Sequence, residues 1–515
     1  MNLKKLFNEW KWLVLVLVII LFIGLGLRVC SLTILPIFAD EAIYIRWAQV
    51  MRAESTLRFL PLSDGKQPLF MWLMIPLLKL IQDPLFAGRF LSVLTGMGTI
   101  LGVFVASYLL FKSKKVALIA SFVYSLVPLA VFFDKMALAD SMLTMFGVWI
   151  LAIGIVLVRT LRLDVAMILG FVLGGALLTK SPALYFSLLL PTLVLFIQKK
   201  KDFWRYFILL IPTYLIGYGI FNILRLGPNF HMLALRNLDY VYPLSHILSS
   251  PLDPFKPFVD RSKEFYWIMG GGSLMIMWLV SYLVNFKSKL KELFVLTVWF
   301  LGPILISSEF SKTMTARYVL FSLPFYVIIA SAIFLINTKK LKIIQFLLIS
   351  IFVVWSLAFN YKLLSNPETA NLPRSERSGY LEEWTAGQGI REISDYLKSQ
   401  SLRNNQTIVV GTEGYFGTLP DGLQIYFDSS PIPSNGSKVK VIGIGLQLDK
   451  VPEQLVDAKK AGDIVYMVVN NERMNTDYTK LDLKLIKEFK KATRPNGTTQ
   501  SLLLFEVLDE TISKF

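Results

Sequence analysis

Two adjacent carboxylates, Asp40 and Glu41, directly follow the first long apolar run, in PIFADEAIYIRWAQVM. Acidic side chains at a bilayer edge are costly unless they are solvated or used. One of them could act as a general base that takes a proton from an acceptor hydroxyl. The alternative is a solvated helix N-terminus, where acidic side chains favour the helix dipole. Spacing alone leaves both interpretations open, and the helix that follows would place Glu41 and Tyr44 on one face.

Several cations recur in the connections between later apolar runs. Lys66 opens GKQPLFMW, Lys180 lies at a break between two apolar runs in LTKSP, and Arg317 enters a late apolar run. Arg89, in AGRFLS, is a weaker example of the same pattern. Such cations could hold a phosphate, with arginine binding it in bidentate fashion. The alternative is that they are interfacial side chains that reach to the headgroups and anchor the helices.

Asp140 lies between two apolar runs, in FFDKMALADSMLTMF. Spacing alone favours Asp140 as a helix N-cap, because Asp-Ser precedes a helical pattern. It could also face a site. Cys30 is the one cysteine, and His231 and His246 are the two histidines, so the sequence predicts neither a cysteine cluster nor a multi-histidine metal site.

The elements that position these residues are membrane spans. Of the 515 residues, 54% are hydrophobic and 17% are charged, whereas a soluble globular protein carries about 25% charge. This composition excludes soluble, fibrous and disordered classes, and it predicts a multi-pass α-helical membrane protein whose first apolar run is an uncleaved span. The segments long enough to span are 12–37, 88–111, 116–133, 141–158, 164–179, 182–198, 204–224, 265–285, 292–308, 318–336 and 342–360.

Basic clusters predict the orientation of these eleven spans. Five clusters follow the N-terminal Lys4 and Lys5, near residues 112–115, 159–162, 199–205, 287–291 and 339–342. All of them fall in the cytoplasm if the apolar segment 69–81 is a juxtamembrane helix that does not cross. The N-terminus is then cytoplasmic, and the candidate acids and cations lie on the extracytoplasmic side.

The net charge of +17 is placed unevenly along the chain. Residues 1–360 carry 34 Lys and Arg against 16 Asp and Glu, whereas residues 361–515 carry 19 against 20. We therefore expect a basic membrane domain, 1–360, that contacts anionic lipids rather than nucleic acid, and an extracytoplasmic α/β domain, 361–515. In that tail we expect helices at 389–400 and 452–461 and strands at 407–411, 423–427, 439–445, 463–469 and 501–507.

Five short motifs, taken in order, resemble the GT-C glycosyltransferases, especially the protein O-mannosyltransferase and lipid A aminoarabinose transferase (ArnT) group. They are Asp40-Glu41, KQPLFMW (66–72), AGRFLS (87–92), KMALAD (135–140) and LTKSP (178–182). The segment ARYVLFSLPFY (316–326) is a looser match. The resemblance implies a GT-C fold of about 11–13 transmembrane helices in the plasma membrane.

The resemblance also implies an activity. It points to a glycosyltransferase that moves a hexosyl, mannosyl or pentosyl group from a polyprenyl-phosphate donor to a hydroxyl of a protein, lipid or glycan. Asp40 matches the catalytic base, Glu41 its neighbour, and Asp140 an acid that faces the active site. The cations Lys66, Lys180, Arg317 and Arg89, with Tyr44, would form the donor phosphate site. Single displacement implies inversion at the anomeric carbon.

The sequence departs from the family pattern at three positions. Gln67 stands for the first proline after the motif lysine, and Ser181 for a glycine. Gly65 stands where ArnT-like sequences carry an acid linked to a bound metal, so we predict no metal and no required cofactor, although the reaction is compatible with a divalent metal.

Two other classes of function stay open. A transporter or flippase for a polyprenyl-linked lipid would explain the spans and cations, but it predicts internal two-fold repeats, and none is evident. A non-catalytic assembly protein would use the tail as a binding module.

Overall fold

The computed structural model describes residues 3–404, 406–427, 438–445, 450–476, 481 and 483–509, with the side chains of 3–9 left out. The chain forms two compact units. Unit 1 comprises Met1–Leu32, Arg58–Trp72 and Arg89–Pro373. Unit 2 comprises Thr33–Leu57, Leu73–Gly88 and Arg374–Phe515.

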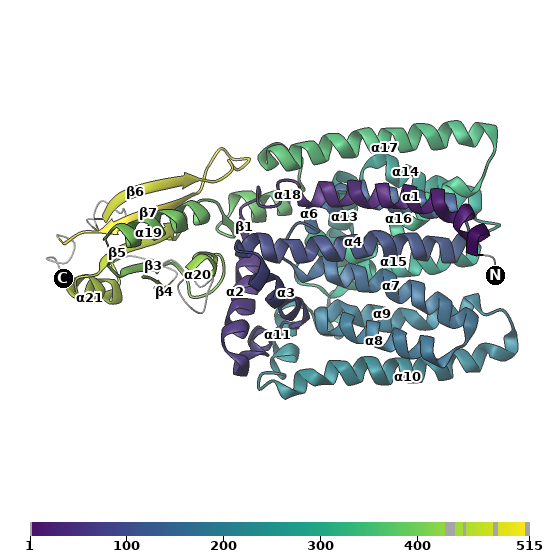
Figure 1. Cartoon of the computed structure of the whole chain (residues 1–515), viewed down its shortest axis with the longest axis horizontal. Helices are drawn as coiled ribbons and strands as arrows, with labels where there is room; N and C mark the ends of the chain where they lie inside the picture. Colours follow the sequence, from purple (N-terminus) through teal and green to yellow (C-terminus); the bar gives the residue numbers. More distant parts are fainter. Residues whose placement is uncertain are drawn as a thin grey trace. The chain divides into compact units, whose positions relative to one another are not determined.

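Unit 1 is a bundle of helices, with the N-terminus at one end and α11 at the other (Figure 1). Its helices are α1 (Leu3–Val29), most of α4 (Pro84–Phe111), α5 (Lys114–Leu126), α6 (Pro128–Phe133), α7 (Ala139–Thr160), α8 (Leu163–Thr179), α9 (Leu184–Leu189), α10 (Phe203–Phe221), α11 (Met232–Tyr240), α12 (His246–Ser249), α13 (Phe255–Phe265), α14 (Gly272–Asn285), α15 (Leu290–Phe310), α16 (Leu323–Ser331) and α17 (Lys339–Ser365). All eleven predicted apolar segments are helical over most of their length.

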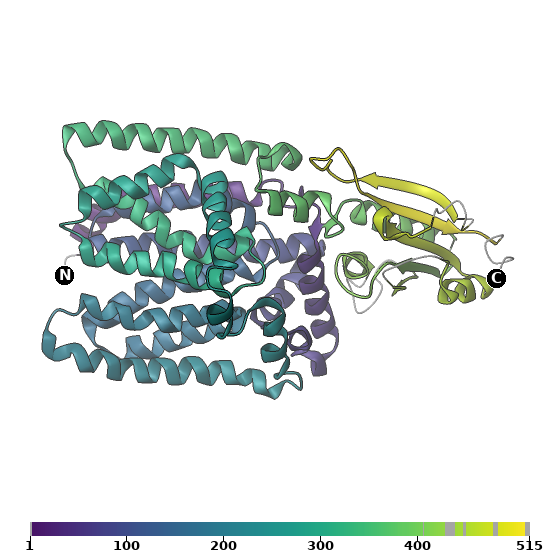
Figure 2. The same ribbon diagram turned by 180° about the vertical axis from the view of Figure 1, so that it is seen from behind.

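Fewer of these segments are uninterrupted spans than the sequence predicted. Among the described residues, seven helices are long and apolar enough to cross a membrane, or eight if the bent pair α13–α14 counts as one. That pair bends by 109° at Gly271, and Figure 2 shows α13 crossing the direction of the long helices. The segment 116–133 is divided at Pro128, because proline has no N–H to continue the helix. Breaks within helices and helices that are too short therefore explain why the structure has fewer uninterrupted spans than the eleven that the sequence predicted.

Close backbone contact fixes α8 against α10. A Cβ on Gly170 would lie 2.8 Å from Ile216 Cβ, and one on Gly174 would lie 2.7 Å from Ile220 Cδ1. Any larger side chain at either glycine would push the helices apart. Small residues spaced four apart are a usual basis of such packing in membranes, where apolar side chains gain nothing by leaving lipid. This packing sets the position of Lys180, which follows α8 directly.

A buried ion pair joins α1 to the turn that precedes α7. Arg28 Nε lies 2.9 Å from Asp134 Oδ2, and both side chains are fully buried. Ser141 Oγ, in the first turn of α7, donates to Asp134 Oδ1 over 2.5 Å. Breaking a buried pair leaves an uncompensated charge, which costs about 3–5 kcal/mol. The start of α7 is therefore anchored beside α1.

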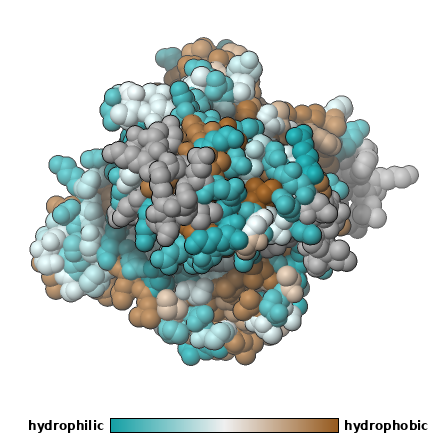
Figure 3. All heavy atoms as spheres, turned by 90° about the vertical axis from the view of Figure 1, so that its left-hand side faces the viewer, coloured by the Kyte–Doolittle hydropathy of each residue, from teal (hydrophilic) through white to brown (hydrophobic). Residues whose placement is uncertain are grey.

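Unit 2 contains a five-stranded sheet in the order β4-β3-β5-β7-β6. β3 is parallel to β4 and β5, whereas β7 is antiparallel to both β5 and β6. Figure 3 shows a mainly hydrophilic surface over this part of the chain. The strands are β3 (Ile408–Thr412), β4 (Val439–Gly443), β5 (Ile464–Asn470), β6 (Leu483–Lys490) and β7 (Ser501–Val507).

Helices cover both faces of the sheet, as expected for an α/β tail. Leu455 and Val456 of α21 (Glu453–Lys460) pack on one face with Val465 and Phe505. On the other face, Tyr396 of α19 (Ile390–Asn404) has its ring 6.0 Å from that of Tyr466. Both predicted helices and four of the five predicted strands are confirmed.

The predicted strand 423–427 is wrong, because this segment lies within the helix α20 (Asp421–Phe427). Five residues are too few to separate a two-residue period from a buried helix. β6 was not predicted, because its exposed lysines mask its alternation.

The loop after α1 belongs to unit 2 rather than to the helical bundle. β1 (Ile37–Phe38) pairs with β2 (Ala386–Gly387) in an antiparallel sheet. The helix α2 (Ala39–Ala53) packs on α20, where Gln49 Nε2 donates to the carbonyl of Ile425 over 2.8 Å. Near α3 (Leu69–Leu80), Arg391 of the tail pairs with Asp83 over 2.8 Å. The compact units therefore divide the chain differently from the predicted boundary after residue 360.

A buried acid lies where α20 begins. Asp421 is 7% exposed, and its Oδ2 accepts from the Gly417 amide over 2.7 Å. Burial raises the pKa of Asp421 to about 6, against the opposing effects of the Gly417 amide and the Arg46 guanidinium. The folded state therefore binds a proton here more tightly than the unfolded state, whose pKa is near 3.8.

We predict that this carboxyl stabilises the fold below pH 4 and that its contribution is lost as the pH rises through 6. The variant Asp421→Asn should be more stable than wild type at pH 7.5, by at most about 3 kcal/mol, with no such gain near pH 4. Thermal unfolding of the purified protein between pH 4 and 7.5 measures this, with exposed Asp395→Asn as control. Equal pH dependence of Asp421→Asn and wild type would contradict it.

Candidate functional site in the helical unit

An ion pair joins the start of α7 to the end of α8. Lys180 Nζ lies 2.6 Å from Asp140 Oδ1, and the two side chains are 22% and 5% exposed. The N-cap of α7 is Leu138, so the interpretation of Asp140 as an N-cap is wrong. Asp140 lies instead in the first turn, where an acidic side chain suits the helix dipole. Its carboxylate is directed to a lysine from another helix.

Arg317 and Tyr318 join this pair from a 3₁₀ segment, Ala316–Ser322. Lys180 Nζ lies 5.2 Å from the centre of the Tyr318 ring, and the Arg317 guanidinium lies 5.4 Å from it. Both distances are within the range of cation–π attraction. We call Asp140, Lys180, Arg317 and Tyr318 the cation cluster. It combines the positive charges of Lys180 and Arg317 with the negative charge of Asp140.

The corner that carries Lys66 has a left-handed backbone and no room for a side chain at Gly65. Gly65 has φ +66°, and a Cβ there would lie 2.6 Å from Arg236 Cβ and 2.9 Å from the Met232 carbonyl. Asp64, one residue earlier, pairs with Arg236 over 2.6 Å. An acid at position 65 therefore cannot fit without moving α11. Lys66 Nζ then lies 4.7 Å from the centre of the Tyr240 ring.

The other two departures from the family pattern contact each other. Gln67 Nε2 donates to Ser181 Oγ over 2.8 Å. Neither proline nor glycine, the family residues at these positions, has a side chain that could make this bond. The bond links the Lys66 corner to the residue next to Lys180. The motifs around residues 66 and 180 are thus brought together.

The long loop 225–264 is tied to the segment before Arg317. Val241 and Ser311 form an antiparallel bridge, and the Lys312 amide donates to the Tyr240 carbonyl over 2.8 Å. Tyr240 thus connects Lys66 with the segment that leads to the cation cluster. Sequence reasoning missed Tyr240 and the Asp64–Arg236 pair, because partners more than 170 residues apart leave no local signal.

Asp40, Glu41 and Tyr44 belong to unit 2, on α2. Glu41 is fully buried, and its Oε2 accepts from the Phe38 amide over 3.0 Å, so it caps its own helix. Asp40 is half-buried. Tyr44 is 7% exposed and stacks on Trp47, with 6.1 Å between the rings. Of the acidic pair, Glu41 therefore has a structural contact that accounts for its burial.

Arg89 is fully buried in unit 1, and its Nη1 donates to the Leu32 carbonyl over 2.9 Å. It thus holds the backbone just after α1. Over the part of the chain that the structure describes, no group of three or more His, Cys, Asp or Glu side chains is placed to hold a metal ion.

We predict that Lys180 and Asp140 stabilise unit 1 only as a pair. Lys180→Met leaves a buried carboxylate without its cation and should lower the free energy of unfolding by about 1–3 kcal/mol. Adding Asp140→Asn should recover most of that loss. Thermal unfolding in detergent measures both, with the exposed Lys199→Met as the matched control. Additive losses from the two substitutions would contradict the pairing.

The chain was compared with known protein families, curated sequences and solved structures. Residues 65–222 match the family model described as dolichyl-phosphate-mannose-protein mannosyltransferase. No curated protein sequence matches the chain.

Solved structures resemble the whole chain. ArnT from Cupriavidus metallidurans in the apo state superposes with a TM-score of 0.57 at 13% identity, over 98% of this chain and 99% of that one. The same enzyme bound to undecaprenyl phosphate gives 0.54 at 14% identity, over 98% and 99%. The oligosaccharyltransferase AglB from Archaeoglobus fulgidus, with an inhibitory peptide and a dolichol-phosphate, gives 0.50 at 12% identity, over 98% and 77%. The motif resemblance is therefore confirmed: the chain has the fold of the GT-C glycosyltransferases, with the mannosyltransferase family match in its membrane part.

Proposed function

We propose that this protein transfers a sugar from a polyprenyl-phosphate carrier to a hydroxyl of a protein, lipid or glycan, with Asp40 as the general base. The observation that carries the proposal is the cation cluster, in which Lys180, Arg317 and Asp140 come together on a GT-C fold. Support comes from the similar ArnT structure, which holds undecaprenyl phosphate, and from AglB, which holds a dolichol-phosphate.

The proposed step is a single displacement. The acceptor oxygen forms a bond to the anomeric carbon as the bond from that carbon to the phosphate oxygen breaks. The Asp40 carboxylate takes the proton of the acceptor hydroxyl, and the polyprenyl phosphate leaves with the electron pair. Attack opposite to the leaving group inverts the anomeric configuration. The acceptor class stays open, with hexosyl, mannosyl and pentosyl donors as candidates.

The cations would stabilise the charge on the departing phosphate. Arg317 offers a planar fork of donors that matches two phosphate oxygens. Lys180 is held in place by Asp140, and Lys66 would contribute from the neighbouring corner. Arg89 and Tyr44 complete the proposed donor set. Phosphate is a good leaving group when neutralised in this way, so the mechanism requires no metal.

We also propose that the reaction takes place on the extracytoplasmic face of the plasma membrane. The basic clusters between the spans favour a cytoplasmic N-terminus, and the candidate residues would then lie on the opposite side. Under this topology the tail is extracytoplasmic.

Replacing the base should remove turnover and leave donor binding intact. We predict that Asp40→Asn lowers kcat by about 10²–10⁴-fold, because amide nitrogen and oxygen cannot take the proton. The assay is release of prenyl phosphate by the purified protein. Glu54→Gln, which changes an exposed acid at the other end of α2, is the matched control. Equal turnover by Asp40→Asn and wild type would remove Asp40 as the base.

Replacing a cation of the cluster should weaken donor binding. We predict that Arg317→Gln raises the KM for the donor about 10- to 100-fold, the equivalent of a lost charge-assisted contact of about 1.5–3 kcal/mol. Arg225→Gln is the control, because the exposed Arg225 guanidinium also lies over an aromatic ring, 4.8 Å from the centre of Phe230. The same change in KM for both variants would contradict a specific phosphate contact.

A further inference from the structure

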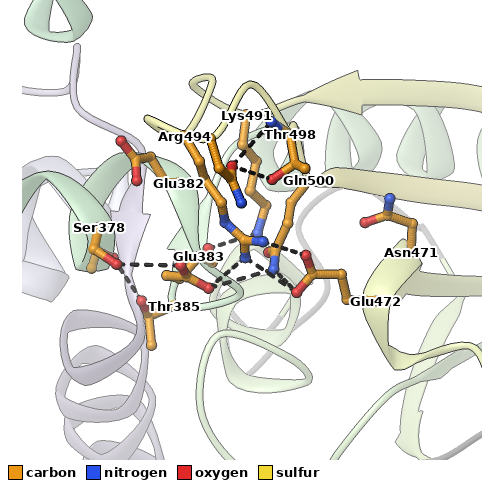
Figure 4. Close-up of polar contacts among 12 residues, drawn as sticks. Ser378, Glu382, Glu383, Thr385, Asn471, Glu472, Lys491, Arg494, Thr498 and Gln500 are labelled. Carbon is orange, nitrogen blue, oxygen red and sulfur yellow. Dashed lines mark hydrogen bonds and ion pairs between the residues drawn. The ribbon is translucent and has the colours of Figure 1, made fainter.

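A half-buried polar cluster in unit 2 holds the segment that follows the last membrane helix. Arg494 Nη2 lies 2.7 Å from Glu383 Oε2, and Arg494 Nη1 lies 2.5 Å from Glu472 Oε1. Gln500 Nε2 donates to Glu383 over 3.4 Å, and Lys491 Nζ donates to the Glu383 carbonyl over 2.9 Å. In Figure 4 the Arg494 guanidinium points between the two carboxylates. Glu383 is thus fixed through both its side chain and its backbone.

Backbone contacts extend from Glu383 to the first turn of α2. The Ala386 amide donates to the Glu383 carbonyl over 2.9 Å, and Thr385 is fixed by a bond from its Oγ1 to the Gly379 carbonyl. The Thr385 carbonyl accepts from the Ala39 amide over 3.0 Å. Asp40 is the next residue after Ala39.

Two further contacts hold this junction. In the β1–β2 pairing, Ile37 lies opposite Gly387 and Phe38 opposite Ala386. The ring of Phe38 lies 4.3 Å from that of Tyr380. The backbone on either side of Thr385 therefore determines where α2 begins and in which direction Asp40 starts its helix. One residue, Trp384, separates Thr385 from Glu383.

We propose that Glu383 and Arg494 are positioning residues for Asp40, so that the tail is a structural part of the catalytic apparatus rather than a separable binding module. This inference rests on the proposed function of Asp40. The polar groups of this half-buried cluster are paired by charge-assisted hydrogen bonds. Removing one side chain therefore leaves its partners without a hydrogen-bond partner. Without Arg494, the carboxylates of Glu383 and Glu472 lose the guanidinium that they share, and the segment before β2 loses one of the contacts that hold it.

Kinetics of the full-length protein test this inference. Arg494→Ala should lower kcat about 10-fold with the donor KM unchanged, and Arg494→Lys should restore part of it. Glu383→Gln, which keeps the side-chain shape, should resemble Arg494→Ala. The matched control is Lys484→Ala, which removes an exposed ion pair with Glu506 in the same sheet. A folded Arg494→Ala with wild-type kcat, or an equal loss in Lys484→Ala, would overturn the proposal.

A double substitution separates this proposal from the proposed function. If Arg494 acts through Asp40, adding Arg494→Ala to Asp40→Asn should cause no further loss of kcat. Multiplied losses would overturn the positioning role while leaving Asp40 as the base. If Asp40→Asn is fully active, the proposed function itself fails.

Hydrogen exchange gives a second readout that does not depend on turnover. In Arg494→Ala, peptides covering residues 37–46 should take up deuterium at least about 10-fold faster, because the Thr385 carbonyl that accepts from the Ala39 amide is held less firmly. Peptides from β5 should keep their protection. Unchanged exchange at 37–46 would overturn the proposal. If Arg494→Ala does not fold, Glu383→Gln and Arg494→Lys provide the same comparison.

Discussion

Each buried charge of the helical unit needs a partner, because the interior of a membrane bundle offers little solvation. Two ion pairs meet this constraint beside the proposed site. Arg28 and Asp134 join α1 to the turn before α7, and Lys180 and Asp140 join the start of α7 to the end of α8. Because the two pairs share the start of α7, the cation cluster depends on both. The glycines that let α8 approach α10 complete the frame on which Lys180 is placed.

Residues of the tail hold the helix α2 in place. The helix α2 follows the first membrane span in the sequence but belongs to unit 2, where it packs on α20. Strand pairing at β1–β2 fixes its start, and the Gln49 bond to α20 fixes its second half. The Glu41 carboxylate accepts from the Phe38 amide and so caps the helix, and in the proposed function Asp40 is the general base.

Much of this architecture could be predicted from the sequence. Apolar runs, basic clusters and the change in charge at the tail indicated a multi-pass protein with an α/β tail, and ordered motifs indicated the family. Pro128 and Gly271 were not recognised as breaks, because hydropathy averages over them. The partners Asp140–Lys180 and Gln67–Ser181 are 40 and 114 residues apart, so spacing could not pair them. Residues 33–57 belong to unit 2 because of strand pairing between distant parts of the chain, which a local sequence pattern does not reveal.

The most direct test of the central claim uses the purified wild-type protein in sealed vesicles with a panel of radiolabelled polyprenyl-phosphate sugars and a membrane or cell-wall acceptor fraction. A glycosyltransferase should cleave one donor, with prenyl phosphate released and label moved to the acceptor in equal amounts. Movement of intact donor across the bilayer, without cleavage of any donor in the panel, would contradict the claim and identify a flippase.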